Sequence, residues 1–338
     1  MLKNNCLISI VVPFYNVDLY FDFFLESLLP LDDNFEIILV DDGSKDNSIN
    51  IAQKFSNLYN NVKILSKENG GLSSARNYGL KYASGEHVIF LDSDDYIEDK
   101  NVLFKMYEKA KSTHADIVLA TYYEFSDLKV KKFRYDRTNF IHDLIFLDDR
   151  LNKLMDNDVS FAVWNKMFKV DFLIKNKLLF KEGIWFEDLE FIYRAFFYAN
   201  KISKVDDVLL GYRQRLGSIM KTITPKILDK IFVLNDLLIF LEKQNLLNRF
   251  YEKFKILYIR MAFSVIYAVV MNEGKNDEKR TIINTIFNSS FFLTIFSEEL
   301  LFKGNLTIAE KIFYHLIKYK IINRYNIVYL GFLQTKKN

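Results

Sequence analysis

Residues 88–95 read Val-Ile-Phe-Leu-Asp-Ser-Asp-Asp, so four apolar residues run directly into a cluster of three acids. An apolar run of this kind is typical of a strand buried on both faces, as in a parallel sheet. Ligands bind at the carboxyl ends of such strands, which is where Asp92, Asp94 and Asp95 would lie. A divalent cation with a diphosphate completing its shell would relieve the repulsion between these acids. A solvated acidic turn, with Asp95 capping the next helix, explains this segment alone equally well.

The segments around this run alternate between strand and helix patterns. Runs rich in β-branched residues predict strands, and apolar residues at helical spacing predict helices. Strands are expected at residues 7–12, 35–40, 62–65, 88–91, 116–121 and 205–212, and helices at about 17–29, 46–58, 75–82 and 101–111. This alternation predicts an α/β fold with a mostly parallel, Rossmann-like sheet and flanking helices.

The pattern changes twice further along the chain. Residues 122–184 are irregular, with helices expected at 140–155 and 170–176 and an aromatic-polar stretch at 163–168. After Thr224 the sequence reads as helices, at about 226–244, 248–271, 278–288 and 306–319. The chain of 338 residues is therefore expected to carry a helical C-terminal region after its α/β part.

Composition excludes several classes of protein. The net charge is only +3, which gives no nucleic-acid-binding footprint. The single cysteine, Cys6, excludes an intramolecular disulfide framework and a cysteine-based zinc cluster. The N-terminus lacks the design of a signal peptide, and Arg260 interrupts the longest apolar run, residues 256–271, which is shorter than the roughly 20 residues a spanning helix needs. We therefore expect a cytoplasmic protein.

Polar residues follow three of the predicted strands. Tyr15 follows the first, Asp42 the second and Asp94 the fourth. Because the carboxyl ends of parallel strands meet at one edge, a nucleotide would find there an aromatic platform, a carboxylate for a base N–H and a metal site for its phosphates. Each residue alone is explained by turn chemistry or by the abundance of aromatics. The three together favour a nucleotide site.

Three later features carry charge. Glu187 and Asp188 fall in the first turn of a predicted helix, where the helix dipole favours acids and where a general base could also stand. Residues 213–218 begin with Arg213 and include Arg215, a basic turn suited to phosphate contact or lid closure. Residues 301–338 carry seven Lys or Arg against one acid, interleaved with apolar residues. That tail suits an anionic membrane surface, and it is equally consistent with a helical cap or a homodimer interface.

The ordered set of motifs resembles glycosyltransferase family 2 enzymes with the GT-A fold, of the bacterial capsule and lipooligosaccharide type. The resemblance spans about residues 7–220 and rests on the motifs Ile10–Asn16, Val40–Ser44, Asn69–Asn77, Leu91–Asp95, Trp164–Lys166, Glu187–Asp188 and Tyr212–Arg215. It implies a GT-A domain at residues 1–222, with a nucleotide-binding half at about 7–121 and an acceptor half at about 122–222. Residues 223–338 form the helical C-terminal region.

The resemblance also implies a role for each matching residue at the donor site. Tyr15, beside Pro13, would stack on the base, Asp42 would accept from uracil N3–H, and Arg76 would approach the diphosphate. Asp92 would face the ribose or the metal, and Asp94 would ligate Mn²⁺ or Mg²⁺. The predicted nucleotide-binding set is completed by Asn16 and Ser93.

For the acceptor, the resemblance implies that Asp188 deprotonates the attacking hydroxyl, with Glu187 as the alternative base. Trp164 would offer an apolar platform to a sugar ring. The remaining acceptor or lid residues are Asn165, Lys166, Arg213 and Arg215.

The implied activity is inverting, metal-dependent transfer of one sugar from a nucleotide-sugar, expected to be a UDP-sugar. The acceptor would be a glycan or a lipid-linked molecule in bacterial surface polysaccharide synthesis, at the inner face of the cytoplasmic membrane or in the cytoplasm. The Gln-x-x-Arg-Trp pattern of processive synthases is missing, because neither Trp164 nor Trp185 follows an arginine. Two alternatives remain: a nucleotidyltransferase that makes activated sugars, and a non-catalytic glycan-binding protein on the same fold.

Overall fold

The computed structural model describes residues 6–125, 140, 142–214, 224–271, 276–299 and 306–321. The chain divides into two compact units. The first comprises Met1–Leu154, Asp158–Gly183 and Glu187–Arg215, and the second comprises Met155–Asn157, Ile184–Phe186 and Leu216–Asn338. The chain therefore passes into the second unit twice for three residues, and returns to the first at Asp158 and at Glu187.

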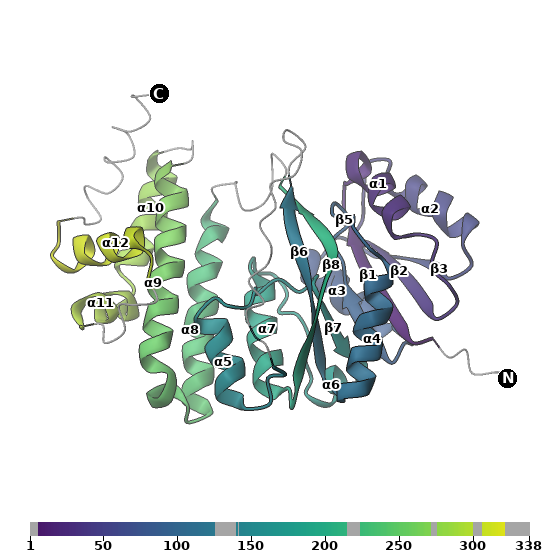
Figure 1. The fold of residues 1–338 in the computed structure, drawn as a ribbon. Helices are drawn as coiled ribbons and strands as arrows, with labels where there is room; N and C mark the ends of the chain where they lie inside the picture. The colour runs from purple at the N-terminus through teal and green to yellow at the C-terminus, as the bar shows by residue number, and fades with distance from the viewer. Residues whose placement is uncertain are drawn as a thin grey trace. The chain divides into compact units, whose positions relative to one another are not determined.

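The first unit is built on an eight-stranded sheet with the order β3-β2-β1-β4-β7-β6-β8-β5 (Figure 1). Its parallel half consists of β1 (Ile8–Phe14), β2 (Phe35–Asp41), β3 (Val62–Ser66) and β4 (His87–Phe90), connected in order by α1 (Asp18–Leu28), α2 (Ser48–Leu58) and α3 (Leu72–Lys81). Every residue of β1, β2 and β4 is buried, as their mostly apolar sequences predict. The predicted α/β alternation is confirmed here.

The other half of the sheet is mixed rather than parallel. The short strand β7 (Lys166–Lys169) lies antiparallel between β4 and β6 (Ile117–Phe125). β8 (Ile202–Arg213) runs parallel to β6, and β5 (Tyr96–Ile97) pairs antiparallel with β8. The aromatic-polar stretch at 163–168 thus contains a strand that its sequence did not indicate. Pairing on both sides stabilises β7, although four residues are too few to show a period.

The helices of this half complete the first unit. They are α4 (Asn101–Thr113), α5 (Leu147–Met155), α6 (Val170–Lys175) and α7 (Glu187–Tyr198). α5 is shorter than the helix expected at 140–155, and β6 continues four residues beyond the expected end at Thr121. α7 begins at Glu187, so the predicted catalytic pair opens the helix.

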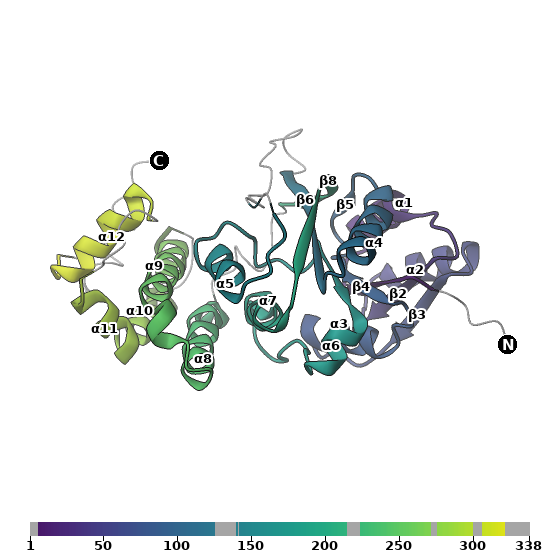
Figure 2. The same ribbon diagram turned by 60° about the horizontal axis from the view of Figure 1, so that its bottom comes forward.

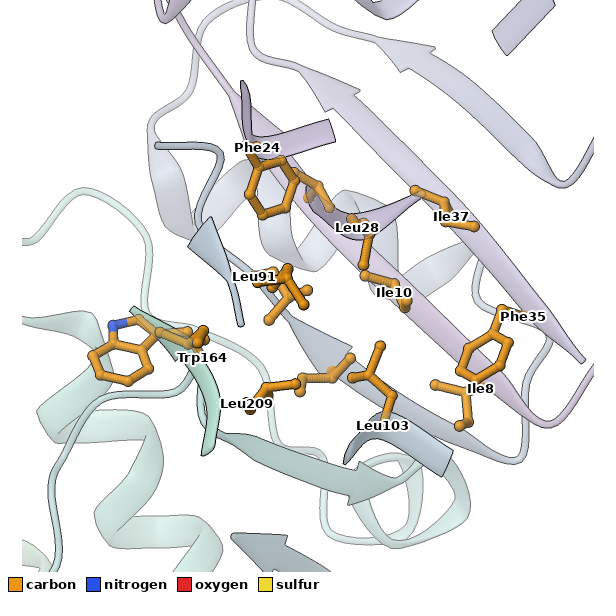
Figure 3. Close-up of a cluster of buried hydrophobic side chains, with 14 of the residues drawn as sticks. Ile8, Ile10, Phe24, Leu28, Phe35, Ile37, Leu91, Leu103, Trp164 and Leu209 are labelled. Atoms are coloured by element: carbon orange, nitrogen blue, oxygen red, sulfur yellow. The ribbon is translucent and has the colours of Figure 1, made fainter. Parts of the chain in front are cut away.

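One core cluster packs helices onto the sheet (Figure 3). It is formed by buried apolar side chains that include Ile10, Phe24, Leu91 and Leu209. On α3, Gly79 permits a close approach to the sheet, since a Cβ there would lie 2.4 Å from Cγ1 of Val11. The close packing of α3 fixes the position of its preceding turn.

The second unit is helical, as predicted. It contains η2 (Pro225–Leu228), α8 (Asp229–Lys243), α9 (Leu247–Met271), α10 (Asn276–Phe287), α11 (Ser290–Ser297) and α12 (Ile308–Lys318). Figure 2 shows α11 and α12 beside α9 and α10. Arg260 of α9 pairs with Oε1 of Glu310 in α12 at 3.3 Å, so the charge that interrupts the apolar run has a partner inside the unit.

Helix α9 is longer than the apolar run identified in the sequence. Among the described residues it alone is long and apolar enough to cross a membrane, with 25 residues and a mean hydropathy of 1.7 over 18 of them. Of that window, 56% is buried within the protein. A core helix of a water-soluble protein has the same length and composition, so this feature does not identify a membrane span.

Candidate active site

Arg76 brings together three carboxylates that lie far apart in the sequence. Its side chain is only 1% exposed. Nη1 donates to Oε1 of Glu187 at 2.9 Å and to Oδ1 of Asp188 at 2.6 Å, while Nη2 donates to Oδ1 of Asp92 at 2.8 Å. The first turn of α7, the loop after β4 and helix α3 therefore meet at one guanidinium. The two candidate general bases, Glu187 and Asp188, therefore share a site with Asp92, the first acid of the 92–95 loop.

Burial dominates the electrostatics of these acids. Burial and the neighbouring charge of Asp188 raise the pKa of Glu187 to about 7, although Arg76 acts in the opposite direction. Burial also raises the pKa of Asp188, and again Arg76 opposes the shift. The pKa of Arg76 is raised overall because its three carboxylates outweigh the effect of burial. The permanently charged guanidinium of Arg76 thus contacts two carboxyl groups, those of Glu187 and Asp188, which bind their protons more tightly than usual.

The orientation of Asp188 is fixed from both sides. Its Oδ2 accepts a hydrogen bond from the backbone N–H of Val163 at 3.1 Å, and Oδ1 is held by Arg76. Among the residues that the structure describes, the Glu187 carboxylate accepts a hydrogen bond from one other side chain, that of Arg76. The Val163 amide was not predicted, since nothing in an apolar residue signals a functional backbone N–H.

The loop after β4 alternates between exposed and buried side chains. Asp92 and Asp94 are partly exposed, whereas Ser93 and Asp95 are buried. Oδ1 of Asp95 accepts from the backbone N–H of Arg213 at 2.9 Å, and its Oδ2 has no hydrogen-bond partner. Burial, Asp94 and Asp92 raise the pKa of Asp95 well above its usual range. Asp95 therefore supports the loop, whereas Asp92 and Asp94 remain partly accessible to solvent.

Arg213 lies at the end of β8 rather than in the predicted basic turn. Its Nε donates to the carbonyl oxygen of Asp94 at 2.7 Å, and its guanidinium lies 5.1 Å from the Tyr20 ring, 5.2 Å from Phe23 and 4.7 Å from Phe125. The side chain is 9% exposed. This placement corrects the expectation of a mobile lid at Arg213, because pairing with β6 extends β8 through that residue. Arg215 lies outside the described residues.

Asp42 sits in a cradle at the ends of β1, β2 and β3. Its Oδ1 accepts from Nζ of Lys67 at 2.8 Å and from Gly70 N at 3.0 Å, and its Oδ2 accepts from Gly71 N at 2.8 Å. Gly71 has φ +84, a conformation that side chains rarely adopt. Lys67 was not among the predicted site residues, although its place just after the third strand could have indicated it.

The end of β1 and the loop after it lie beside this cradle, because β1 and β2 are neighbouring strands of the sheet. Pro13 is buried within β1, and Tyr15 is 44% exposed. Asn16 adopts φ 50, and its Oδ1 accepts from Lys45 N at 2.8 Å. The exposed Tyr15 ring therefore follows the end of β1, in a loop that is hydrogen-bonded to the loop after β2.

The predicted acceptor residues of the 164–166 segment are in the interior. Trp164 belongs to the buried core cluster (Figure 3) and is 5% exposed. Its ring stacks on Tyr212 at 5.2 Å and meets Tyr122 edge-on at 4.3 Å. Oδ1 of Asn165 accepts from Nζ of Lys166 at 2.7 Å, and both side chains are fully buried. The structure therefore gives none of the three an exposed face, which corrects the expectation that they contact the acceptor.

The acids suit a metal that is bound jointly with a substrate. Across the described ranges, no group of three or more His, Cys, Asp or Glu side chains is placed to hold a metal ion. Mg²⁺ needs no such cage when one or two carboxylates and the phosphates of a substrate complete its shell. Asp92 and Asp94 offer hard oxygen ligands in a partly exposed loop, so their chemistry fits Mn²⁺ or Mg²⁺.

Comparisons with known proteins agree with this geometry. The family model for glycosyl transferase family 2 matches residues 9–175. The chain is 31% identical over 282 residues to a cholesterol galactosyltransferase of Borreliella burgdorferi, covering 78% of this chain and 77% of that protein. It is 34% identical over 223 residues to the glycosyltransferase GlyG of Streptococcus pneumoniae, covering 64% and 73%.

Solved structures show the same fold. TarS 1-349 of S. aureus, crystallised with UDP-GlcNAc, superposes with a TM-score of 0.66 at 24% identity, covering 97% of this chain and 92% of that chain. A mannosyltransferase of Pyrobaculum calidifontis, in complex with GDP-Man and Mn²⁺, gives a TM-score of 0.53 at 14% identity, covering 94% and 87%. These likenesses confirm the GT-A fold, and the sequence relatives assign the activity class. The chain is a glycosyltransferase and belongs to glycosyl transferase family 2.

Proposed function

We propose that the protein transfers a single sugar from a UDP-sugar, with inversion, to a glycan or lipid-linked acceptor in the synthesis of a bacterial surface polysaccharide. The observation that carries this proposal is the contact of one buried guanidinium, that of Arg76, with Asp92 and Asp188. It joins a loop suited to a metal and a diphosphate to a carboxylate suited to act as a base. Donor activation and acceptor deprotonation can therefore occur in one place.

Asp188 is the proposed general base. It takes the proton of the acceptor hydroxyl while the hydroxyl oxygen attacks the anomeric carbon, and the bond from that carbon to the diphosphate oxygen breaks. Arg76 and the Val163 amide hold the carboxylate in one orientation. The raised pKa of Asp188 favours proton uptake. Glu187 lacks a second support, which makes it the weaker candidate.

Asp94, with Asp92, would hold Mn²⁺ or Mg²⁺. Such an ion would supply Lewis-acid neutralisation of the charge on the leaving UDP. Both terminal nitrogens of Arg76 are bonded to carboxylates and the side chain is almost fully buried, so we assign it the orientation of these acids in place of direct contact with the diphosphate. Arg213 fixes the backbone at Asp94 from the other side of the loop.

Tyr15 and Asp42 would recognise the base. The exposed Tyr15 ring is available for stacking, and the cradle formed by Lys67, Gly70 and Gly71 orients the Asp42 carboxylate toward one fixed direction. A uracil N3–H would add one more donor to a carboxylate that already accepts three hydrogen bonds. The UDP-GlcNAc complex of TarS supports the choice of a UDP-sugar.

We further propose that the protein works at the inner face of the cytoplasmic membrane. Helix α12 exposes Ile308, Ile312 and Tyr319, which are 78%, 54% and 65% accessible. Their spacing places them on one side of the helix, and Lys311 and Lys320 flank them without an ion-pair partner among the described residues. An apolar stripe beside free cations suits an anionic lipid surface.

The function is tested by incubating the protein with a panel of nucleotide-sugars and Mn²⁺ and measuring the nucleotide released. We expect UDP release from one or a few UDP-sugars, increased by an acceptor that bears a free hydroxyl. No release from any donor would contradict the proposal. A nucleotidyltransferase would instead release pyrophosphate from a nucleoside triphosphate and a sugar 1-phosphate.

A further inference from the structure

Two lysines of the helical unit lie over the aromatic rings of the segment just before the catalytic pair. Nζ of Lys226 lies 6.0 Å from the Trp185 ring, and Nζ of Lys230 lies 4.7 Å from the Phe186 ring. Lys226 in η2 and Lys230 in α8 are four positions apart, about one helical turn, which places them on the same side. We refer to these four residues as the lysine–aromatic cluster.

The aromatic segment is held in a fixed and strained conformation. The backbone N–H of Trp185 donates to Oδ2 of Asp229 at 2.8 Å. Phe186 has φ 63, in the left-handed region that bulky residues rarely adopt. Such strain persists where surrounding contacts impose it, and it is concentrated at functional sites. Phe186 is bonded directly to Glu187, so this strained residue precedes the proposed base by two positions.

The two ammonium groups lack a counter-ion among the described residues. The only hydrogen bond of Lys230 there is to Oγ of Ser264, at 3.1 Å, and burial lowers the pKa of Lys230 to about 8. Lys226 is exposed, and in the same ranges it makes no ion pair. Asp229 lies between them in sequence, but its carboxylate is directed to the Trp185 amide. Two cations on one face with no acid to neutralise them favour a dianionic ligand.

We propose that the lysine–aromatic cluster binds a phosphate group carried by the acceptor. Lys226 and Lys230 would supply the two charges, and lysine is a common phosphate ligand. The rings of Trp185 and Phe186 would cover the carbon atoms next to the phosphate. The role of the ligand as acceptor rests on the proposed sugar transfer; the anion site itself does not.

The fluorescence of Trp185 reports on the cluster directly. The full-length protein is titrated with inorganic phosphate, with glycerol 3-phosphate and with uncharged glycerol as the matched control. We expect saturable changes with the two phosphates and none with glycerol. Trp185→Phe should remove the signal and leave the other tryptophan, Trp164, in the core. A short-chain phosphatidic acid, used below its micelle concentration, distinguishes a lipid-borne phosphate from that of a polyol or glycan by its relative affinity.

The lysines are tested by charge removal. The double variant Lys226→Met and Lys230→Met should lose at least about tenfold in affinity for glycerol 3-phosphate, as expected for charge-assisted contacts. Lys243→Met, at the other end of α8, removes one positive charge, as Lys226→Met alone does, and should bind as the wild type does. If the double variant fails to fold, Lys226→Met alone, at an exposed position, should lose at least about threefold. UDP affinity should be unchanged in all three.

Unchanged phosphate affinity in the lysine variants, or an equal loss in Lys243→Met, would overturn the site. So would the absence of saturable binding to the wild type. Nucleotide release from sugar donors is measured on the same preparations, so the two proposals fail separately. Donor turnover without phosphate binding refutes the cluster alone. Cluster-dependent phosphate binding without turnover of any donor refutes the sugar transfer and leaves the anion site.

Discussion

Nη1 of Arg76 lies 2.6 Å from Oδ1 of Asp188, a residue 112 positions further along the chain. The same guanidinium holds Asp92 and Glu187, so one side chain links α3, the loop after β4 and the start of α7. A buried cation with three carboxylates stabilises the fold and also orients the proposed catalytic acids. Changes at this site should therefore affect stability and activity in separable ways.

Replacing Arg76 should destabilise the first unit. Arg76→Met leaves three acids without their counter-ion, and we expect a loss of about 3 kcal/mol in the free energy of unfolding at neutral pH. Urea unfolding followed by circular dichroism measures it. The same substitution in a Glu187→Gln background should cost less, because one uncompensated acid is gone. Equal losses in the two backgrounds would show that Arg76 does not act through these carboxylates.

Asp188→Asn should abolish transfer and spare the donor site. Removing a general base lowers kcat by about 10²–10⁴-fold, while UDP binds elsewhere in the site and should keep its affinity. Initial rates and calorimetric titration with UDP check the two effects. Asp207→Asn, at a half-exposed position on β8, is the control and should keep full activity. Turnover that survives in Asp188→Asn would place the base at another residue.

The stability of the protein should depend on Glu187 between about pH 4.5 and 7. Because the folded protein raises the pKa of Glu187 to about 7, it binds that proton more tightly than the unfolded chain does. The contribution of Glu187 to the free energy of unfolding is therefore fully present below pH 4.5 and is lost as the pH rises through 7. Thermal melts of Glu187→Gln and wild type at pH 5 and pH 8 test this, and the variant should gain relative stability at pH 8. A constant difference across this range would contradict the assignment.

The acids of the 92–95 loop should differ in their effect on metal use. Asp94→Asn should raise the Mn²⁺ concentration needed for half-maximal activity by at least about tenfold, after metal removal with EDTA. Asp95→Asn should change it little, since the pKa of Asp95 is raised well above its usual range and an amide matches a neutral carboxyl in shape. The reverse order of sensitivity would assign the ligand to Asp95.

Helix α12 should mediate binding to anionic vesicles. The double variant Ile308→Glu and Ile312→Glu adds charge to the exposed apolar stripe and should abolish sedimentation with phosphatidylglycerol vesicles. Neutral phosphatidylcholine vesicles serve as the lipid control, and Leu293→Glu, exposed on α11, as the protein control. If the α12 variant sediments as well as the wild type, this face does not bind membrane.

The sequence predicts the parallel half of the sheet well because each strand there is mostly apolar and is followed by polar loop residues. The sequence also predicts that Asp42 and Asp94 lie at one edge of the sheet, since parallel strands end together. It could not predict that Arg76 neutralises Asp188, because a contact across 112 positions leaves no local pattern. The resemblance to the family placed both residues in the site but gave Arg76 a different partner.

Three further differences have physical causes. Trp164 in an aromatic-polar motif suits a sugar platform or a core, and only the packing against Tyr122 and Tyr212 decides between them. β7 is too short to show alternation, and its place between β4 and β6 depends on residues distant in sequence. The same holds for Arg213, whose position in a strand follows from pairing with β6.

The pairing of β5 has a consequence for the order in which the protein folds during synthesis. β5 directly follows the 92–95 loop, yet its partner is β8, and Asp95 receives its hydrogen bond from Arg213, 118 residues later. When only β1–β4 have been synthesised, the acidic 92–95 loop is therefore preceded by a paired strand, β4, but is not yet followed by one. The 92–95 loop can reach its final conformation only after β8 leaves the ribosome, because long-range pairings form late. A chain truncated before β8 would keep the parallel half of the sheet and lack an ordered 92–95 loop.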